Sequence, residues 1–177
     1  MMPFYPTEEK IIPWPKLSSW RRENILEQTN PEYKNGPLDT QLVVTNGCFD
    51  ILHVGHIEYL EEARRQGDKL LVGVNDDDSV RCLKGKGRPK NCALYRARVL
   101  SALECVDYVT IFPSPSQGNA AAFLKKARPK VYVKGGDYSI ETLNKEELEI
   151  LQKYKSNIYF SKLVEGVSTT KLLDNDL

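Results

Sequence analysis

The sequence lacks the features of several specialised classes of protein. Its 177 residues contain only four cysteines (Cys48, Cys82, Cys92 and Cys105), and no two of them form a Cys-x-x-Cys pair. That spacing argues against a zinc knuckle or a redox motif, so we expect free thiols in a reducing compartment. No stretch approaches the roughly 20 apolar residues of a membrane span, and no long early apolar run predicts a secretory signal. We therefore predict a cytoplasmic protein.

The net charge is also close to zero, because the chain has 25 basic and 24 acidic residues. A general nucleic-acid binder normally carries a strong basic excess, so we expect neither nucleic acid nor a membrane as a partner. A small anionic ligand stays open, because its pocket needs only local positive charge. The length suits one domain with a real core.

The first 40 residues differ in composition from the remainder. They contain six of the ten prolines and both tryptophans, Trp14 and Trp20. Proline at this density prevents long regular structure, although residues 18–28 are compatible with one short helix. We interpret residues 1–40 as an N-terminal arm and residues 41–177 as the domain. Since large aromatic side chains are seldom left bare, the arm is expected to pack on the body or on a neighbouring subunit.

From Gln41 onward, short apolar runs alternate with helical patterns. The expected strands are Leu42–Thr45, Leu70–Val74, Tyr108–Phe112, Val131–Val133 and Ile158–Phe160. One expected helix carries an apolar stripe at helical spacing, formed by Tyr95, Val99, Ala102, Leu103 and Val106, and another spans residues 141–154. This alternation predicts an α/β fold, a Rossmann-like doubly wound parallel sheet of about five strands with helices on both faces. Ligands of such sheets bind beyond the carboxyl ends of the strands.

Both histidines of the protein lie in the loop after the first expected strand. This loop reads Thr45-Asn46-Gly47-Cys48-Phe49-Asp50-Ile51-Leu52-His53-Val54-Gly55-His56. A spacing of three at a helix start places His53 and His56 on one side, and Gly55 leaves room for a ligand near the backbone. Two imidazoles beside free helix N–H groups form an anion site. Two alternatives stay open: an incidental pair, or metal ligation by Asp50, His53 and His56.

Three further strand-end loops are rich in phosphate-binding chemistry. Residues 75–79 (Asn-Asp-Asp-Asp-Ser) either help to hold Mg²⁺ or form a helix N-terminus. Residues 84–89 (Lys-Gly-Lys-Gly-Arg-Pro) supply counter-charges to a polyphosphate or form a solvated basic loop. Residues 134–138 (Lys-Gly-Gly-Asp-Tyr) allow close contact with a base or form an ordinary turn.

Two other features have competing interpretations as well. Residues 165–170 (Glu-Gly-Val-Ser-Thr-Thr) are a helix cap or a second phosphate site. Arg96 either extends along the edge of the apolar stripe or reaches a phosphate. Among the loops that follow the expected strands, only that of residues 113–116 shows no phosphate-binding chemistry.

Taken together, these residues resemble a known family. GCFDILHVGH is similar to the signature of the cytidylyltransferase-like nucleotidyltransferases, the HxGH superfamily. The likeness covers residues 41–173 and takes in VNDDDSV, LKGKGRP, the helix with Arg96, KGGDY and VEGVSTT in family order.

Within this superfamily, the sequence most resembles the D-glycero-beta-D-manno-heptose 1-phosphate adenylyltransferases. In some bacteria that enzyme is fused to a sugar kinase. Glycerol 3-phosphate cytidylyltransferases usually show GTFD in the first loop and an Arg-Thr pair before the last Glu-Gly. This chain has Leu163 and Val164 at the latter place, which argues against that branch.

The resemblance implies transfer of AMP from ATP to a sugar 1-phosphate, with Mg²⁺. It implies catalytic roles for His53, His56, Lys84 and Arg96. The implied nucleotide site consists of Gly47, Cys48, Phe49, Gly55, His56, Lys134, Gly135, Asp137, Tyr138, Ser168, Thr169 and Thr170. The implied substrate site consists of Asp50, Asn75, Asp77, Lys84 and Arg88. No dedicated metal site follows, although Asp77 is a candidate to meet Mg²⁺ through the phosphates.

Three rival functions remain at this point. One is a cytidylyltransferase acting on glycerol 3-phosphate or a similar alcohol phosphate, which a comparison of CTP with ATP would reveal. The second is a metal hydrolase built on the histidine loop. The third is a non-catalytic nucleotide-binding protein. A homodimer is expected from the family, and the aromatic arm is a candidate to contribute to it.

Overall fold

The computed structural model describes residues 7–26, 40–114, 119–135 and 138–162. Within these ranges the strands are β1 (Leu42–Gly47), β2 (Lys69–Asn75), β3 (Tyr108–Phe112), β4 (Val131–Lys134) and β5 (Asn157–Phe160). They form one parallel sheet in the order β3-β2-β1-β4-β5. The predicted Rossmann-like doubly wound sheet is therefore confirmed, and each predicted strand is present with ends shifted by at most two residues.

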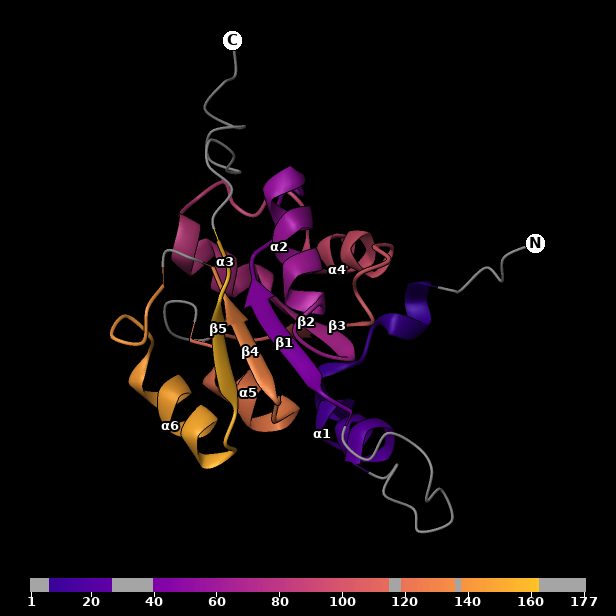
Figure 1. Cartoon of the computed structure of the whole chain (residues 1–177). Helices are drawn as coiled ribbons and strands as arrows, with labels where there is room; N and C mark the ends of the chain where they lie inside the picture. The colour runs from indigo at the N-terminus through magenta and orange to yellow at the C-terminus, as the bar shows by residue number, and fades with distance from the viewer. Residues whose placement is uncertain (1–6, 27–39, 115–118, 136–137, 163–177) are drawn as a thin grey trace, which may run out of the picture.

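Helices cover both faces of the sheet, as Figure 1 shows. One face packs against α2 (Val54–Arg64) and α4 (Ala93–Ser101), and the other packs against α1 (Leu17–Arg21), α5 (Ala121–Ala127) and α6 (Lys145–Lys153). The two cores divide β1 by alternation, because Val43 points into the first and Leu42 and Val44 into the second. A further helix, α3 (Asp77–Lys84), begins directly beyond β2.

The described part of the arm packs on the body. Ile12 is buried in the second core, and its backbone N–H donates to the Val109 carbonyl on β3 at 2.8 Å. The Trp20 ring meets the Tyr108 ring edge-on at 4.5 Å, and Trp14 lies over Phe112. The expected short helix is α1, followed by one π-helical turn, residues 22–26. The proline-rich segment thus covers the edge of the sheet at β3, which would otherwise expose unpaired backbone groups.

The expected apolar stripe on α4 does not face the core at Tyr95 and Val99. The helix ends at Ser101, and Tyr95 and Val99 are 65% and 50% exposed. The face toward the sheet instead carries Ala93, Ala97 and Leu100. Two alanines allow the helix to approach the strands closely, so the larger side chains are turned outward.

The order of the strands fixes the place of a ligand crevice. The chain crosses one face of the sheet from β1 to β2 and to β3, then crosses the other face to β4 and β5. The reversal falls between β1 and β4, and ligands of open α/β sheets bind outside the carboxyl ends of the strands at such a point. The loops that follow β1, β2 and β4 therefore border the crevice. Among the residues described, no helix has the length and apolar character to cross a membrane.

Candidate active site

The two histidines form a stacked pair at the start of α2. His53 is the N-cap residue, His56 lies in the first turn, and their ring centroids are 3.8 Å apart. The spacing of three thus places both on one side, as predicted. The Nδ1 atom of each is buried and lacks a hydrogen-bond partner within the described chain. Because buried polar atoms are normally paired, these two nitrogens make this place a candidate ligand site.

Both imidazoles are neutral near neutral pH. Burial lowers the pKa of His53. Burial, and secondly the neighbouring His53, lower the pKa of His56 to about 4. A neutral imidazole presents one N–H donor and one acceptor, so the pair offers two donors without the cost of two adjacent positive charges.

The loop that leads into α2 has a strained, tightly packed backbone. Phe49 has a φ of 46°, a region that bulky residues rarely adopt. Its ring lies 5.3 Å from the His56 ring. A Cβ atom on Gly47 would come within 3.0 Å of the Phe49 ring, so only glycine fits there without displacing it. The loop therefore supports the His56 ring through the Phe49 ring. The role of Gly47 in this structure is to leave room for the Phe49 ring.

Asp50 joins this loop to residues 88–91. Its fully buried carboxylate accepts hydrogen bonds from the backbone N–H groups of Lys90 and Asn91 and from Arg88 Nε at 2.5 Å. Burial alone would raise the pKa of Asp50, but the Asn91 and Lys90 N–H groups and the Arg88 guanidinium lower it overall. The carboxylate is therefore ionised and engaged within the protein. It is not grouped with the histidines as a metal ligand, and no set of three potential ligands among His, Cys, Asp and Glu occurs in the described residues.

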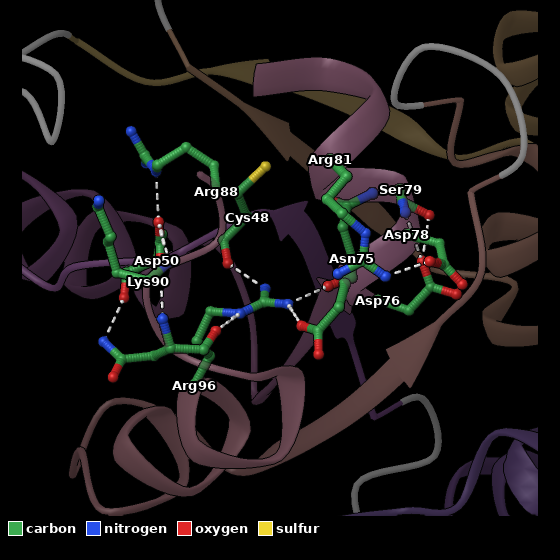
Figure 2. Close-up of polar contacts among 12 residues, drawn as sticks. Cys48, Asp50, Asn75, Asp76, Asp78, Ser79, Arg81, Arg88, Lys90 and Arg96 are labelled. Carbon is green, nitrogen blue, oxygen red and sulfur yellow. Dashed lines mark hydrogen bonds and ion pairs between the residues drawn. The ribbon is translucent and has the colours of Figure 1, made fainter. Parts of the chain in front are cut away.

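Arg96 connects three loops from inside the protein. The residue is 2% exposed, and its guanidinium donates to the carbonyls of Asn91, Cys48 and Asn75. It also pairs with Asp77 at 2.8 Å. Figure 2 shows the guanidinium between Cys48 on one side and Asn75 on the other. In this structure its donors hold the loops after β1 and β2 together, so contact with a phosphate stays a prediction.

Positive charge gathers around Cys48. Burial raises the pKa of the Cys48 thiol, while Lys84, Arg96 and Arg88 oppose that rise. The ion pair between Arg88 and Asp50 holds residues 84–89, the basic loop, against the histidine loop. Lys84 is exposed and Arg88 half-buried, and the backbone between them turns through Gly85 and Gly87, both at positive φ.

Next to β1 in the sheet, β4 ends with the buried Lys134. Its Nζ lies 4.7 Å from the centroid of the Tyr138 ring, and the Tyr138 N–H donates to the Gly135 carbonyl. The remaining residues predicted for the nucleotide site lie outside the described residues: Asp137, Ser168, Thr169 and Thr170.

The end of β2 contributes one more unpaired polar group. Asn75 is 2% exposed, and its Nδ2 has no hydrogen-bond partner within the described chain. The acidic residues that follow, Asp76–Asp78, form the start of a helix, which was one of the two interpretations of this segment. Asp76 caps α3 by accepting a hydrogen bond from the Ser79 N–H. The Asp77 carboxylate is about one-third exposed beside Arg96.

Sequence reasoning missed several residues that shape this site. Asn91 anchors the Asp50 loop through its side chain and its backbone N–H, and nothing in its local sequence marks it. Tyr132 left a signal, because a tyrosine in a buried strand needs a partner for its hydroxyl. That partner is Asn46, with Glu147 nearby.

Comparison with known proteins gives concordant matches. Residues 44–174 match the family described as cytidylyltransferase-like. Among curated proteins, the chain is 40% identical to the "Bifunctional protein HldE" of Syntrophotalea carbinolica over 156 residues, which is 88% of this chain and 30% of the relative. It is 48% identical over 134 residues to the protein of that name in Pseudomonas fluorescens, which is 76% of this chain and 27% of the relative. The chain therefore spans less than a third of the length of these relatives.

Solved structures share the fold. A lipopolysaccharide core biosynthesis protein from Thermoplasma volcanium is 27% identical with a TM-score of 0.55, and the match covers 71% of this chain and 97% of that one. A pantoate-beta-alanine ligase from Francisella tularensis, complexed with beta-gamma ATP and beta-alanine, is 13% identical with a TM-score of 0.54. That match covers 86% of this chain and 66% of the ligase, and at this identity it reports on the fold alone.

Proposed function

The chain belongs to the cytidylyltransferase-like family, and from this premise we propose that it is a nucleotidyltransferase that transfers AMP from ATP to a sugar 1-phosphate. The observation that carries the proposal is the stacked pair of neutral histidines with unpaired, buried Nδ1 atoms at the start of α2. Hydrogen-bond donors aimed at a developing charge are the usual device for stabilising a phosphoryl transition state. Heptose 1-phosphate is the proposed acceptor, supported by the matches to "Bifunctional protein HldE".

In the proposed reaction, an oxygen of the sugar 1-phosphate attacks the α-phosphorus of ATP in line. The bond between the α-phosphorus and the bridging oxygen breaks, pyrophosphate leaves with the electron pair, and an ADP-sugar forms. The nucleophile is already an anion, so no general base is required. Catalysis then rests on positioning and on charge stabilisation. We assign His53 and His56 to the oxygens of the α-phosphate.

The other site residues support this arrangement in different ways. Lys84 and Arg88 lie on the basic edge near Cys48 and are suited to bind phosphate oxygens. Arg96 and Asp50 hold the loops that carry these groups. Gly135 and Tyr138, beyond β4, are assigned to the base and ribose, together with the predicted Asp137. The predicted Ser168, Thr169 and Thr170 are assigned to the β- and γ-phosphates.

Mg²⁺ fits this site as a companion of the triphosphate. Magnesium usually keeps several waters and binds one or two carboxylates together with substrate phosphates. Asp77 is the residue suited to contribute, because its carboxylate is about one-third exposed and Arg96 contacts only Oδ1. When bound, the ion would neutralise charge on the phosphates.

The proposal extends to the cellular location and the oligomeric state. We propose a cytoplasmic enzyme, because ATP and sugar phosphates are found in the cytoplasm. A homodimer is also proposed, supported by the apolar outer face of α4, where Leu94, Tyr95 and Val99 are at least half exposed. Light scattering of the purified protein tests the dimer directly.

The deciding experiment follows pyrophosphate release from purified protein with Mg²⁺ and heptose 1-phosphate, using ATP, CTP, GTP and UTP in turn. Release with ATP alone is expected. Release with CTP and glycerol 3-phosphate instead would move the chain to the cytidylyltransferase branch. Nucleotide binding without any release would leave a non-catalytic binding protein.

A further inference from the structure

A buried cluster of polar side chains lies between β1 and β4, and the proposed mechanism leaves most of it without a role. Its members are Asn46, Tyr132, Lys134 and Glu147. Glu147 is 2% exposed, and Tyr132 is fully buried. Placing a carboxylate and an ammonium in the interior costs free energy, because both lose water. A cluster of this kind at the switch point of the sheet therefore calls for a functional explanation.

Glu147 is at the centre of the cluster. It belongs to the first turn of α6, where Asn144 caps the helix. Its Oε1 accepts a hydrogen bond from the Ala120 N–H at 2.7 Å. Its Oε2 lies 3.2 Å from the Tyr132 hydroxyl and 4.0 Å from Lys134 Nζ. One carboxylate thus contacts the N-cap residue of α5, a core strand residue and the last residue of β4.

The cluster continues from Tyr132 to β1. The Tyr132 hydroxyl donates to Asn46 Oδ1 at 2.7 Å. Burial, and then the charge of Glu147, raise the pKa of Tyr132 well above its usual value, so the hydroxyl keeps its proton and remains a donor. Because the amide oxygen of Asn46 faces Tyr132, its NH₂ group faces the opposite way. Asn46 is half-buried and lies one residue before the end of β1.

Lys134 and Asn46 therefore flank the crevice from neighbouring strands, and Glu147 contacts one directly and the other through Tyr132. We infer that Glu147 is a positioning residue for the nucleotide site, which holds the Lys134 ammonium and orients the Asn46 amide so that both donors face the bound nucleotide. This inference rests on the proposed function, because it requires a nucleotide at the switch point. Asn46, Tyr132 and Glu147 then join the site in addition to the residues that the family resemblance implies.

The substitution Glu147→Gln tests this role. Glutamine retains the shape and an acceptor for the Ala120 N–H but removes the charge beside Lys134. We expect the KM and the Kd for ATP to rise about tenfold, the size of one lost charged hydrogen bond, while kcat stays within about twofold. The matched control is Glu146→Gln, which changes the adjacent exposed glutamate, whose carboxylate accepts from the Asn119 side chain. This variant should bind ATP like the wild type.

A double-mutant cycle separates positioning from a merely structural role. If Glu147 acts through Lys134, then in a Lys134→Ala background the effect of Glu147→Gln on ATP affinity should shrink from about tenfold to the roughly threefold that passes through Asn46. Independent effects that multiply would overturn the inference, and so would a folded Glu147→Gln protein with wild-type affinity. Should Glu147→Gln fail to fold, Tyr132→Phe, which removes only the hydroxyl, should weaken ATP binding about threefold through Asn46.

The binding measurements keep this inference distinct from the proposed function. Calorimetry reports ATP affinity whether or not transfer occurs. A wild-type protein that binds ATP but releases no pyrophosphate with any sugar phosphate would overturn the proposed function, and the variants' affinities would still decide the role of Glu147. A wild-type protein that binds no nucleotide would overturn both.

Discussion

The histidine pair and the Arg96 network lie near each other at the same edge of the sheet, yet they differ in whether their buried polar atoms have hydrogen-bond partners. His53 and His56 each keep a buried Nδ1 without a partner in the described chain. Arg96 is buried more completely than either histidine, but its guanidinium bonds to three carbonyls and one carboxylate. Unpaired buried groups cost free energy that a bound ligand can recover, whereas paired ones hold the scaffold. The first region is thus arranged for binding and the second for support.

The largest effect should come from removing an unpaired donor. We expect His56→Ala to lower kcat by at least about 100-fold, because losing one donor to a transition-state oxyanion typically costs that much. Its thermal unfolding should remain cooperative. The measurement is pyrophosphate release at saturating ATP, with Val54→Ala as the control, since Val54 is 53% exposed in the same helical turn. A soluble His56→Ala protein with near-normal turnover would remove the histidine from the mechanism.

Removing a paired donor should act on stability first. Arg96→Lys keeps the charge but cannot reach all four acceptors, so we expect a loss of about 3 kcal/mol in the free energy of unfolding. Urea denaturation measures it. Arg98→Lys is the matched control on the same helix, because Arg98 is exposed and its Glu8 partner is at the surface, and its effect should stay within about 0.5 kcal/mol. Equal stability of the two variants would contradict the supporting role of Arg96.

Acidification should weaken the free protein through the histidine pair. The pKa of His56 is about 4 in the folded protein against 6.5 unfolded. The unfolded chain therefore binds more protons between these values, and stability is lost as pH falls through this window. The contribution amounts to roughly 2 kcal/mol between about pH 7.5 and about pH 5. Urea titrations at both pH values should show this loss in the wild type and a smaller one in His56→Asn; an identical loss in both would refute the assignment.

The smallest effect is expected at the exposed basic edge. Lys84→Ala should raise the KM for ATP about threefold at low salt and less at high salt, because ions screen an exposed charge. Stability should not change. Lys125→Ala, an exposed lysine on α5, is the control for a general effect of net charge. A salt-independent change in KM would show that Lys84 acts through a specific contact instead.

Two helices show which structural features could be predicted from the sequence and which could not. The pattern of α6 predicted a helix over residues 141–154, and the structure has it at Lys145–Lys153. The pattern of α4 also predicted a helix, but Tyr95 and Val99 of its apolar stripe lie on the exposed face. Periodicity identifies the side chains that share a face, but it does not say which face is covered when both carry apolar residues. Here Ala93 and Ala97 pack inward and Tyr95 is left outside.

The sequence by itself determined the five parallel strands and the placement of both histidines in one strand-end loop, because these depend on local runs and short spacings. Only the tertiary structure decided that Arg96 is enclosed by carbonyls from three loops, and that Glu147 reaches Asn46 through Tyr132. These contacts join residues that are between 5 and 86 positions apart in the chain. The partner of a buried polar group is set by how the layers pack, and no local pattern records that choice.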